Sequence, residues 1–183
     1  MLSSGLHPSL MKAVNPYKTF SYAVGIKEEN KKFVKLGDIG EDKFDREIRE
    51  YIQRETGETL QKLSNSTTFK HWRKFDWGSQ FSKAELKYRP DLNYNRFDNT
   101  MIGYNKIQQG LNQIEKGCRV FFFFGFKDGL FVWELTQNNH KTDGNALNYE
   151  EYWGEPYEKP EYYTPFDPLK KNYYLDIKKL IKV

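Results

Sequence analysis

The chain has 183 residues, with 29 Lys and Arg against 25 Asp and Glu, which gives a formal net charge of +4. Aromatic residues make up 17% of the chain, and this argues against disorder because disordered segments are poor in large apolar side chains. One domain is the natural expectation at this length. No apolar run approaches the roughly 18 residues of a membrane-spanning helix, so we expect no membrane partner.

The compartment is indicated by two further features. The first residues, 1–12, lack the charged and then apolar pattern of a signal peptide. The single cysteine, Cys118, has no second cysteine with which to form an internal disulfide. Both features favour an intracellular, cytoplasmic protein that is not secreted.

Charge is unevenly placed along the chain. Residues 62–90 carry seven Lys or Arg and only two acids, whereas residues 148–167 carry six acids and one Lys. A basic stretch often marks a polyanionic partner, and the simpler alternative is a solvated surface.

The first predicted elements follow an N-terminal extension, residues 1–36, that shows weak periodicity. Apolar spacing predicts a helix over 41–55. Residues 67–77 and 81–88 then alternate as β-strands do, and the break at Gly78-Ser79 predicts that they form a hairpin.

The second half of the chain repeats this order. A polar loop over 90–99 precedes a predicted helix over 102–116. Two strands, 119–126 and 130–136, flank a turn, and the run Phe121 to Phe124 indicates a strand covered on both faces. Residues 137–168 have a loop-like composition, and 172–177 can form a last strand.

This order predicts an α/β fold in which a central mixed sheet is flanked by helices. We expect a core over 37–136, with N- and C-terminal extensions. The C-terminal part, 137–183, is expected to form an aromatic, acidic arm and a strand that packs on the core, within one domain overall.

The candidate chemistry centres on Asp76, Glu85 and Lys87. Glu85 and Lys87 are two residues apart on a predicted strand, so their side chains share a face. The hairpin would bring Asp76 beside Glu85. Paired carboxylates commonly bind a hard divalent cation through oxygen, and Mg²⁺ suits two carboxylates with waters and substrate phosphates. A surface ion pair is the ordinary alternative for Glu85 and Lys87.

These residues resemble the signature of the PD-(D/E)XK nuclease superfamily, which has a restriction-endonuclease-like fold. The matching segments are Asp76 and Glu85-Leu86-Lys87, and the first-helix segment Gly37 to Glu41 resembles Holliday-junction resolvases of this superfamily. Thr100 and Lys106 follow the signature as in small phage and viral members. The resemblance covers roughly residues 37–136, and one departure is that Phe75 replaces the proline that often precedes the aspartate.

The resemblance implies a role for each matching residue. Asp76 and Glu85 would bind Mg²⁺ (or Mn²⁺), together with the backbone carbonyl of Leu86. Lys87 would position or activate the attacking water. Glu41 would complete the site from the first helix, and its alternative is an acid favoured by the dipole of the first helical turn.

A nuclease also needs contacts to its substrate. We expect these contacts from a set of basic and amide side chains: Arg73, Lys74, Lys83, Arg89, Lys106 and Gln109. Contacts of this kind to phosphate give affinity without sequence preference. For Lys106 and Gln109, ordinary solvated helix positions are the alternative.

The resemblance therefore predicts a metal-dependent nuclease that hydrolyses phosphodiester bonds, with DNA favoured over RNA as its substrate. The alternative is a catalytically silent protein of the same fold that serves as a viral structural or nucleic-acid-binding component. A virus- or phage-associated location, virion partners and a homo-oligomer belong to the same set of expectations.

Overall fold

The computed structural model describes residues 26–63, 75–156 and 169–183 of the chain. The chain divides into two compact units. The larger unit consists of residues 35–146 and 172–183, and the smaller one of residues 1–34 and 147–171. The C-terminal strands, which belong to the predicted arm, are therefore part of the larger unit.

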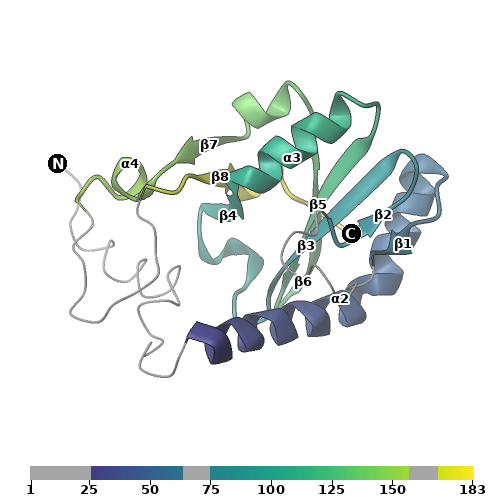
Figure 1. Ribbon diagram of the computed structural model, residues 1–183, viewed down its shortest axis with the longest axis horizontal. Coiled ribbons are helices and arrows are strands. Elements are labelled where there is room, and N and C mark those ends of the chain that lie inside the picture. Colours follow the sequence, from purple (N-terminus) through teal and green to yellow (C-terminus); the bar gives the residue numbers. More distant parts are fainter. Residues whose placement is uncertain (1–25, 64–74, 157–168) are drawn as a thin grey trace. The chain divides into compact units, whose positions relative to one another are not determined.

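Helices and strands are labelled as in Figure 1. In chain order they are α2 (Ile26–Thr56), β1 (Gln61–Lys62), β2 (Trp77–Gly78), β3 (Ser82–Arg89), β4 (Asn99–Gly103), α3 (Tyr104–Ile114), β5 (Arg119–Phe126), β6 (Gly129–Leu135), β7 (Gly144–Leu147), α4 (Tyr149–Trp153), β8 (Asn172–Asp176) and β9 (Ile181–Lys182). Short 3₁₀ helices occur at Tyr94–Arg96, Asn139–Lys141 and Ile177–Lys179.

A central sheet of six described strands has the order β1-β2-β3-β5-β6-β9. Strands β3 and β5 run parallel, and the other neighbouring pairs are antiparallel. A second sheet has the order β4-β8-β7. The expected α/β class, with a central mixed sheet flanked by helices, is confirmed (Figure 1).

The two helices α2 and α3 cover opposite faces of the central sheet. Phe121 and Phe123 of β5 pack in the apolar cluster that includes α2, whereas Phe122 and Phe124 pack in the cluster that includes α3. All four rings are fully buried, which confirms the prediction of a strand covered on both faces. Burial of each ring contributes about 1.5–3 kcal/mol to stability.

Helix α2 begins at Ile26, so the predicted start at residue 41 is wrong. The preceding segment is mostly polar and shows no apolar stripe, and Gly37 and Gly40 look like helix breakers. A Cβ on Gly40 would lie 2.5 Å from Cγ of Tyr88. This glycine lies inside the helix and allows the Tyr88 ring of β3 to pack closely against its backbone.

The start of the second predicted helix, 102–116, also needs correction, whereas the loop predicted before it differs only at its last residue, Asn99. Residues Asn99–Gly103 form strand β4, which pairs with β8, and α3 starts only at Tyr104. Thr100 and Ile102 are buried at alternate positions of the strand. Because Ile102 also fits the apolar spacing of the helix, the sequence pattern merges the two elements.

The expectation of a loop over 137–168 is wrong for its first part. Strand β7 and the short helix α4 lie there. The Asn148 side chain accepts a hydrogen bond from the Glu151 N–H, and the Glu151 carboxylate accepts one from the Asn148 N–H. This reciprocal cap starts α4, and Gly154 ends it with a positive φ of 71°. Within the described part of the chain, no helix has the length and apolar character needed to span a bilayer.

Candidate metal and catalytic site

The hairpin formed by β2 and β3 places Asp76 opposite Glu85. Trp77 pairs with Ala84 and Gly78 with Lys83, and the Asp76 N–H continues the ladder by donating to the Ala84 carbonyl at 3.0 Å. The structure confirms a hairpin here, but in the described part of the predicted first strand only Trp77 is a strand residue, and Gly78, the predicted break, also belongs to β2. Most of the predicted first strand, 67–74, lies outside the described residues.

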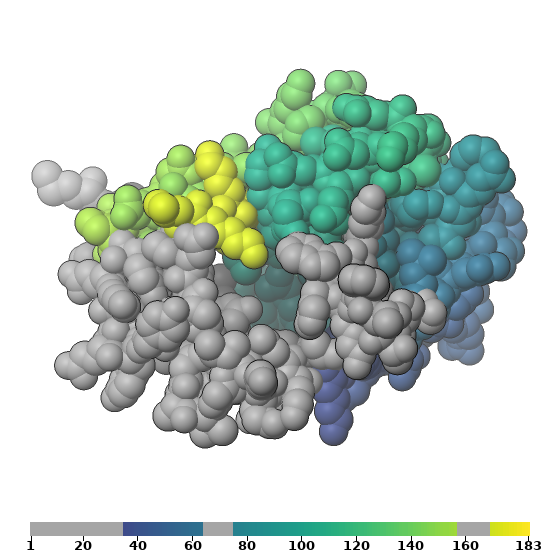
Figure 2. All heavy atoms as spheres, viewed as in Figure 1, coloured from purple at the N-terminus to yellow at the C-terminus, as the bar shows by residue number. Residues whose placement is uncertain are grey.

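Glu85 lies in the middle of β3 on the face that α3 covers. Its side chain is only 5% exposed. Lys87 Nζ lies 2.7 Å from Oε1 of this carboxylate, and Lys106 Nζ lies 2.9 Å from Oε2. The first pair confirms that Glu85 and Lys87 share a face. Lys106 reaches the same carboxylate from the first turn of α3, a helix whose outer side lies at the molecular surface (Figures 1 and 2).

Asp76 lies where an ionised carboxylate is unfavourable. Burial raises its pKa from 3.8 to about 7, and the negative charges of Glu85 and Glu41 add to this rise. The Leu86 N–H donates to Asp76 Oδ2 at 2.8 Å and offsets part of it. Because the N–H and C=O of a strand residue point to the same edge, the Leu86 carbonyl faces the edge on which Asp76 lies.

Glu41 enters this group of acids from α2. It is 8% exposed, and its Oε2 lies 3.3 Å from Lys62 Nζ. The same ammonium contacts Asp42 at 2.8 Å. Desolvation lowers the pKa of Lys62, but the hydrogen bonds to Asp42 and Glu41 outweigh this effect, so the pKa lies above its usual value.

The position of Glu41 in α2 removes its alternative explanation. The helix begins at Ile26, so Glu41 lies well beyond the first turn, where the helix dipole favours an acid. Its side chain is buried, and its negative charge adds to the rise in the pKa of Asp76. We call Glu41, Asp76 and Glu85, with Lys62, Lys87 and Lys106, the acid–lysine cluster.

The cluster has a donor set that suits a hard divalent cation. Two carboxylates, Asp76 and Glu85, and the Leu86 carbonyl are oxygen donors, and Mg²⁺ commonly completes such a set with water. Burial is the main cause of the raised pKa of Asp76, and the negative charges of Glu85 and Glu41 add to it; a bound cation would offset both effects. Among the described residues, however, no three His, Cys, Asp or Glu side chains are grouped to hold a metal by themselves.

The other predicted site residues fall into separate places. Arg73 and Lys74 lie outside the described residues. Lys83 Nζ donates to the Ser79 carbonyl at the hairpin turn, and an Arg89 Nη donates to the Met101 carbonyl of β4. Lys83 and Arg89 therefore each have a backbone acceptor within the chain.

Gln109 lies one turn after Lys106 on α3, and its side-chain oxygen is buried. The described residues offer this oxygen no hydrogen-bond partner. The structure thus places Gln109 on the same side of α3 as the lysine that contacts Glu85.

Lys62 is the cluster member that the sequence did not indicate. Strand β1, on which it lies, has only two residues, too few for an alternating pattern. Its contact with Glu41 joins positions 21 residues apart that no local pattern relates.

A surface hollow of about 530 Å³ is separate from the acid–lysine cluster. It is lined by residues of the β1 region and the β2–β3 turn, among them Glu58, Gly78 and Lys83. No cluster residue lines it. The candidate site therefore rests on the cluster and its chemistry.

Comparison with known proteins yields no relative. No protein-family model matches the chain, and neither a curated protein nor a solved structure gives a significant match.

Proposed function

We propose that the chain is a metal-dependent nuclease of the PD-(D/E)XK type that hydrolyses phosphodiester bonds in DNA, built on a restriction-endonuclease-like fold. The observation that carries the proposal is the convergence of Asp76, Glu85 and Lys87 around one hairpin, with Glu41 beside them. The burial of Asp76 and the negative charges of Glu85 and Glu41 raise its pKa to about 7. Such perturbed groups are concentrated at functional sites.

The residues of the cluster would divide the work of hydrolysis. Asp76, Glu85 and the Leu86 carbonyl would hold Mg²⁺ or Mn²⁺. The bound cation would lower the pKa of a coordinated water and stabilise charge on the scissile phosphate. Lys87, held 2.7 Å from Glu85 Oε1, would orient the attacking water or stabilise negative charge in the transition state.

The proposed partner is a nucleic acid. The choice of DNA over RNA rests on the resemblance to the nuclease superfamily. Lys106 of the cluster and Gln109 both lie on α3, and Arg73 and Lys74 shortly precede Asp76 in the sequence. We propose that these side chains, with Lys83 and Arg89, contact the DNA backbone.

One observation favours a catalytically silent binding or structural protein as the second candidate. Both oxygens of Glu85 already contact lysine ammonium groups. Lysines can replace a metal as counter-ions in a fold that has lost its activity. In this alternative the chain would bind nucleic acid or virion components without cleaving them.

Cleavage of single- and double-stranded DNA tests the proposal. Wild type should cleave with Mg²⁺ or Mn²⁺ and not with EDTA. Asp76→Ala and Lys87→Ala should each lower the rate by roughly 10²-fold or more, because each removes a group from the reacting centre. Far-UV circular dichroism should show that both variants are folded.

Matched controls are Asp91→Ala and Lys178→Ala, which remove the same side chains from exposed positions. They should cleave as wild type does. Wild type that cleaves no DNA with either metal, or variants of the cluster that cleave at the wild-type rate, would overturn the nuclease proposal. The same assay with RNA would show whether RNA, and not DNA, is the substrate.

A further inference from the structure

Each oxygen of the Glu85 carboxylate contacts a lysine ammonium group. Lys87 contacts Oε1 at 2.7 Å, and Lys106 contacts Oε2 at 2.9 Å. The Glu85 side chain is 5% exposed, whereas those of Lys87 and Lys106 are 27% and 19% exposed. The carboxylate thus has little contact with water, and the two ammonium groups provide its counter-charge.

A divalent cation at Glu85 would therefore compete with an ammonium group. A metal–carboxylate bond is shorter than the ammonium contacts, at about 2.0–2.1 Å for Mg²⁺, and an ammonium group on the same oxygen would be repelled by the cation. The cation would therefore weaken or displace at least one of the two lysine contacts.

Lys106 is the lysine that can leave. Lys87 is on the same strand and face as Glu85, two residues away, and so stays close to it. Lys106 reaches Glu85 from another element, at a separation of 21 residues, on a flexible four-carbon stem. A rotation of its side chain would free Oε2 without any movement of α3 or β3.

We propose that Lys106 is a positioning residue that competes with the divalent cation for Glu85. It holds the carboxylate in place when the cation is absent and lowers the affinity of the site for the cation. The inference rests on the proposed metal site and adds its regulation: the chain carries its own replaceable counter-ion.

The test is a titration with Mg²⁺ and Mn²⁺, followed by calorimetry, on wild type, Lys106→Met and Lys106→Gln. Methionine keeps much of the length of the side chain and removes its charge. Both variants should bind the cations at least about tenfold more tightly than wild type, because a repelling charge next to the cation is lost. Glutamine retains an N–H donor for Glu85, so the second variant serves if the methionine variant does not fold.

Lys43→Met is the matched control. Lys43 is an exposed lysine next to Asp42 on α2, and its ammonium lies over the rings of Phe44 and Tyr88, at 4.9 and 5.7 Å from their centres. Its loss changes the net charge by the same amount, and we expect less than about a twofold change in affinity. An equal gain in cation affinity in Lys43→Met and Lys106→Met would show a general charge effect and overturn the inference.

The remaining outcomes separate the inference from the proposed function. Unchanged or weaker binding in the Lys106 variants, with binding by wild type, would overturn the inference and leave the metal site standing. Binding by the Lys106 variants alone would support the inference and overturn the metal-dependent nuclease. No binding by any of the proteins would overturn both.

Discussion

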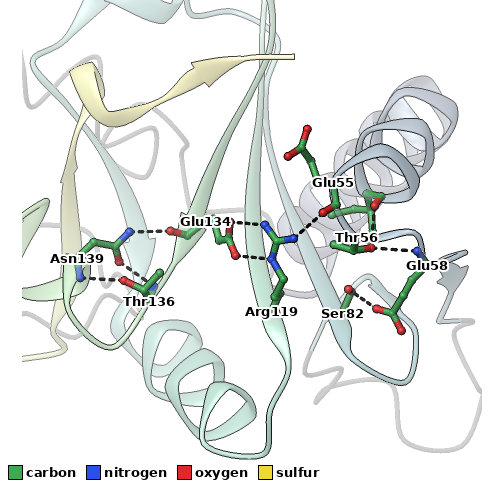
Figure 3. Close-up of polar contacts among 9 residues, drawn as sticks. Glu55, Thr56, Glu58, Ser82, Arg119, Glu134, Thr136 and Asn139 are labelled. Atoms are coloured by element: carbon green, nitrogen blue, oxygen red, sulfur yellow. Dashed lines mark hydrogen bonds and ion pairs between the residues drawn. The ribbon is translucent and has the colours of Figure 1, made fainter.

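Two groups of acidic side chains lie along the same hairpin and differ in how their charge is balanced. At the turn, Glu58 accepts hydrogen bonds from the hydroxyls of Ser79 and Ser82 and from the Phe81 N–H. Burial raises the pKa of Glu58, but these hydrogen bonds outweigh it, so the pKa lies below its usual value. The close-up shows Glu58 directed at Ser82 (Figure 3).

The carboxylate of Glu134, on β6, likewise accepts hydrogen bonds from a neighbouring strand, β5. Arg119 donates two hydrogen bonds to its carboxylate, at 2.7 and 2.8 Å, and a third to the Glu55 carbonyl at 2.7 Å (Figure 3). The hydrogen bond to Glu134 is the main cause of the raised pKa of Arg119. Glu58 and Glu134 thus each have their own hydrogen-bond donors, and these hydrogen bonds join one element to another.

The acid–lysine cluster shows the opposite balance. Burial and the charges of Glu85 and Glu41 raise the pKa of Asp76 to about 7, although the Leu86 N–H donates to it. The hydrogen bonds of Glu58 favour its charged form, whereas burial and neighbouring negative charges disfavour the charged form of Asp76. This difference favours the cluster, and not the turn, as the place of the proposed function.

The largest expected effect comes from removing the charge of Asp76. Its pKa is about 7 in the folded chain and near 3.8 in an unfolded one, so the folded state binds the proton more tightly. The free energy of unfolding should therefore fall as the pH rises from 4 toward 8. At about 1.36 kcal/mol per unit of pKa, this contribution reaches up to about 4 kcal/mol.

Asp76→Asn should remove this pH dependence, because an amide accepts the Leu86 N–H without a charge. Urea unfolding in EDTA at pH 5 and pH 8 measures it in both proteins. The variant should match wild type at pH 5 and exceed it at pH 8. The same loss of stability between pH 5 and pH 8 in both proteins would show that folding does not raise the pKa of Asp76.

A smaller effect is expected from Glu58→Ala, which leaves three donors at the turn without their acceptor. We expect a loss of about 1–2 kcal/mol in the free energy of unfolding, because water can replace part of the interaction at this half-buried position. Urea unfolding at pH 7 measures it. A gain in stability would contradict the stabilising role expected for Glu58 as the hydrogen-bond acceptor at the turn.

The smallest effect is expected from Arg119→Met, since the pair that it forms with Glu134 is partly exposed, at 42% and 35%. Exposed ion pairs contribute little, so we expect a loss of about 0.5–1 kcal/mol. Thermal unfolding at low and high salt measures it, and the loss should shrink at high salt. A loss of stability as large as that expected for Glu58→Ala would contradict the smaller contribution expected from this exposed ion pair.

The sequence predicts the parts of the fold that depend on local periodicity. Strands β3, β5 and β6 and the hairpin turn follow from alternation and turn residues, and the hairpin register then places Asp76 beside Glu85. The start of α2 and strand β4 are not predictable in this way. The polar first part of α2 carries no apolar stripe, and Ile102 of β4 fits the spacing of the helix that follows it.

The candidate site is predictable only within the hairpin. Glu85 and Lys87 share a strand, so their ion pair follows from their spacing. The contacts of Lys106 with Glu85 and of Lys62 with Glu41 join separate elements, each at a separation of 21 residues. Such contacts depend on how the elements pack, which no local pattern contains.

The most direct test of the account is the effect of Mg²⁺ on stability in wild type, Asp76→Asn and Glu58→Ala. At about ten times the dissociation constant, Mg²⁺ should raise the free energy of unfolding of wild type and of Glu58→Ala by about 1.4 kcal/mol, and should leave Asp76→Asn unchanged. No stabilisation of wild type, or equal stabilisation of all three proteins, would contradict the assignment of the acid–lysine cluster as a cation site.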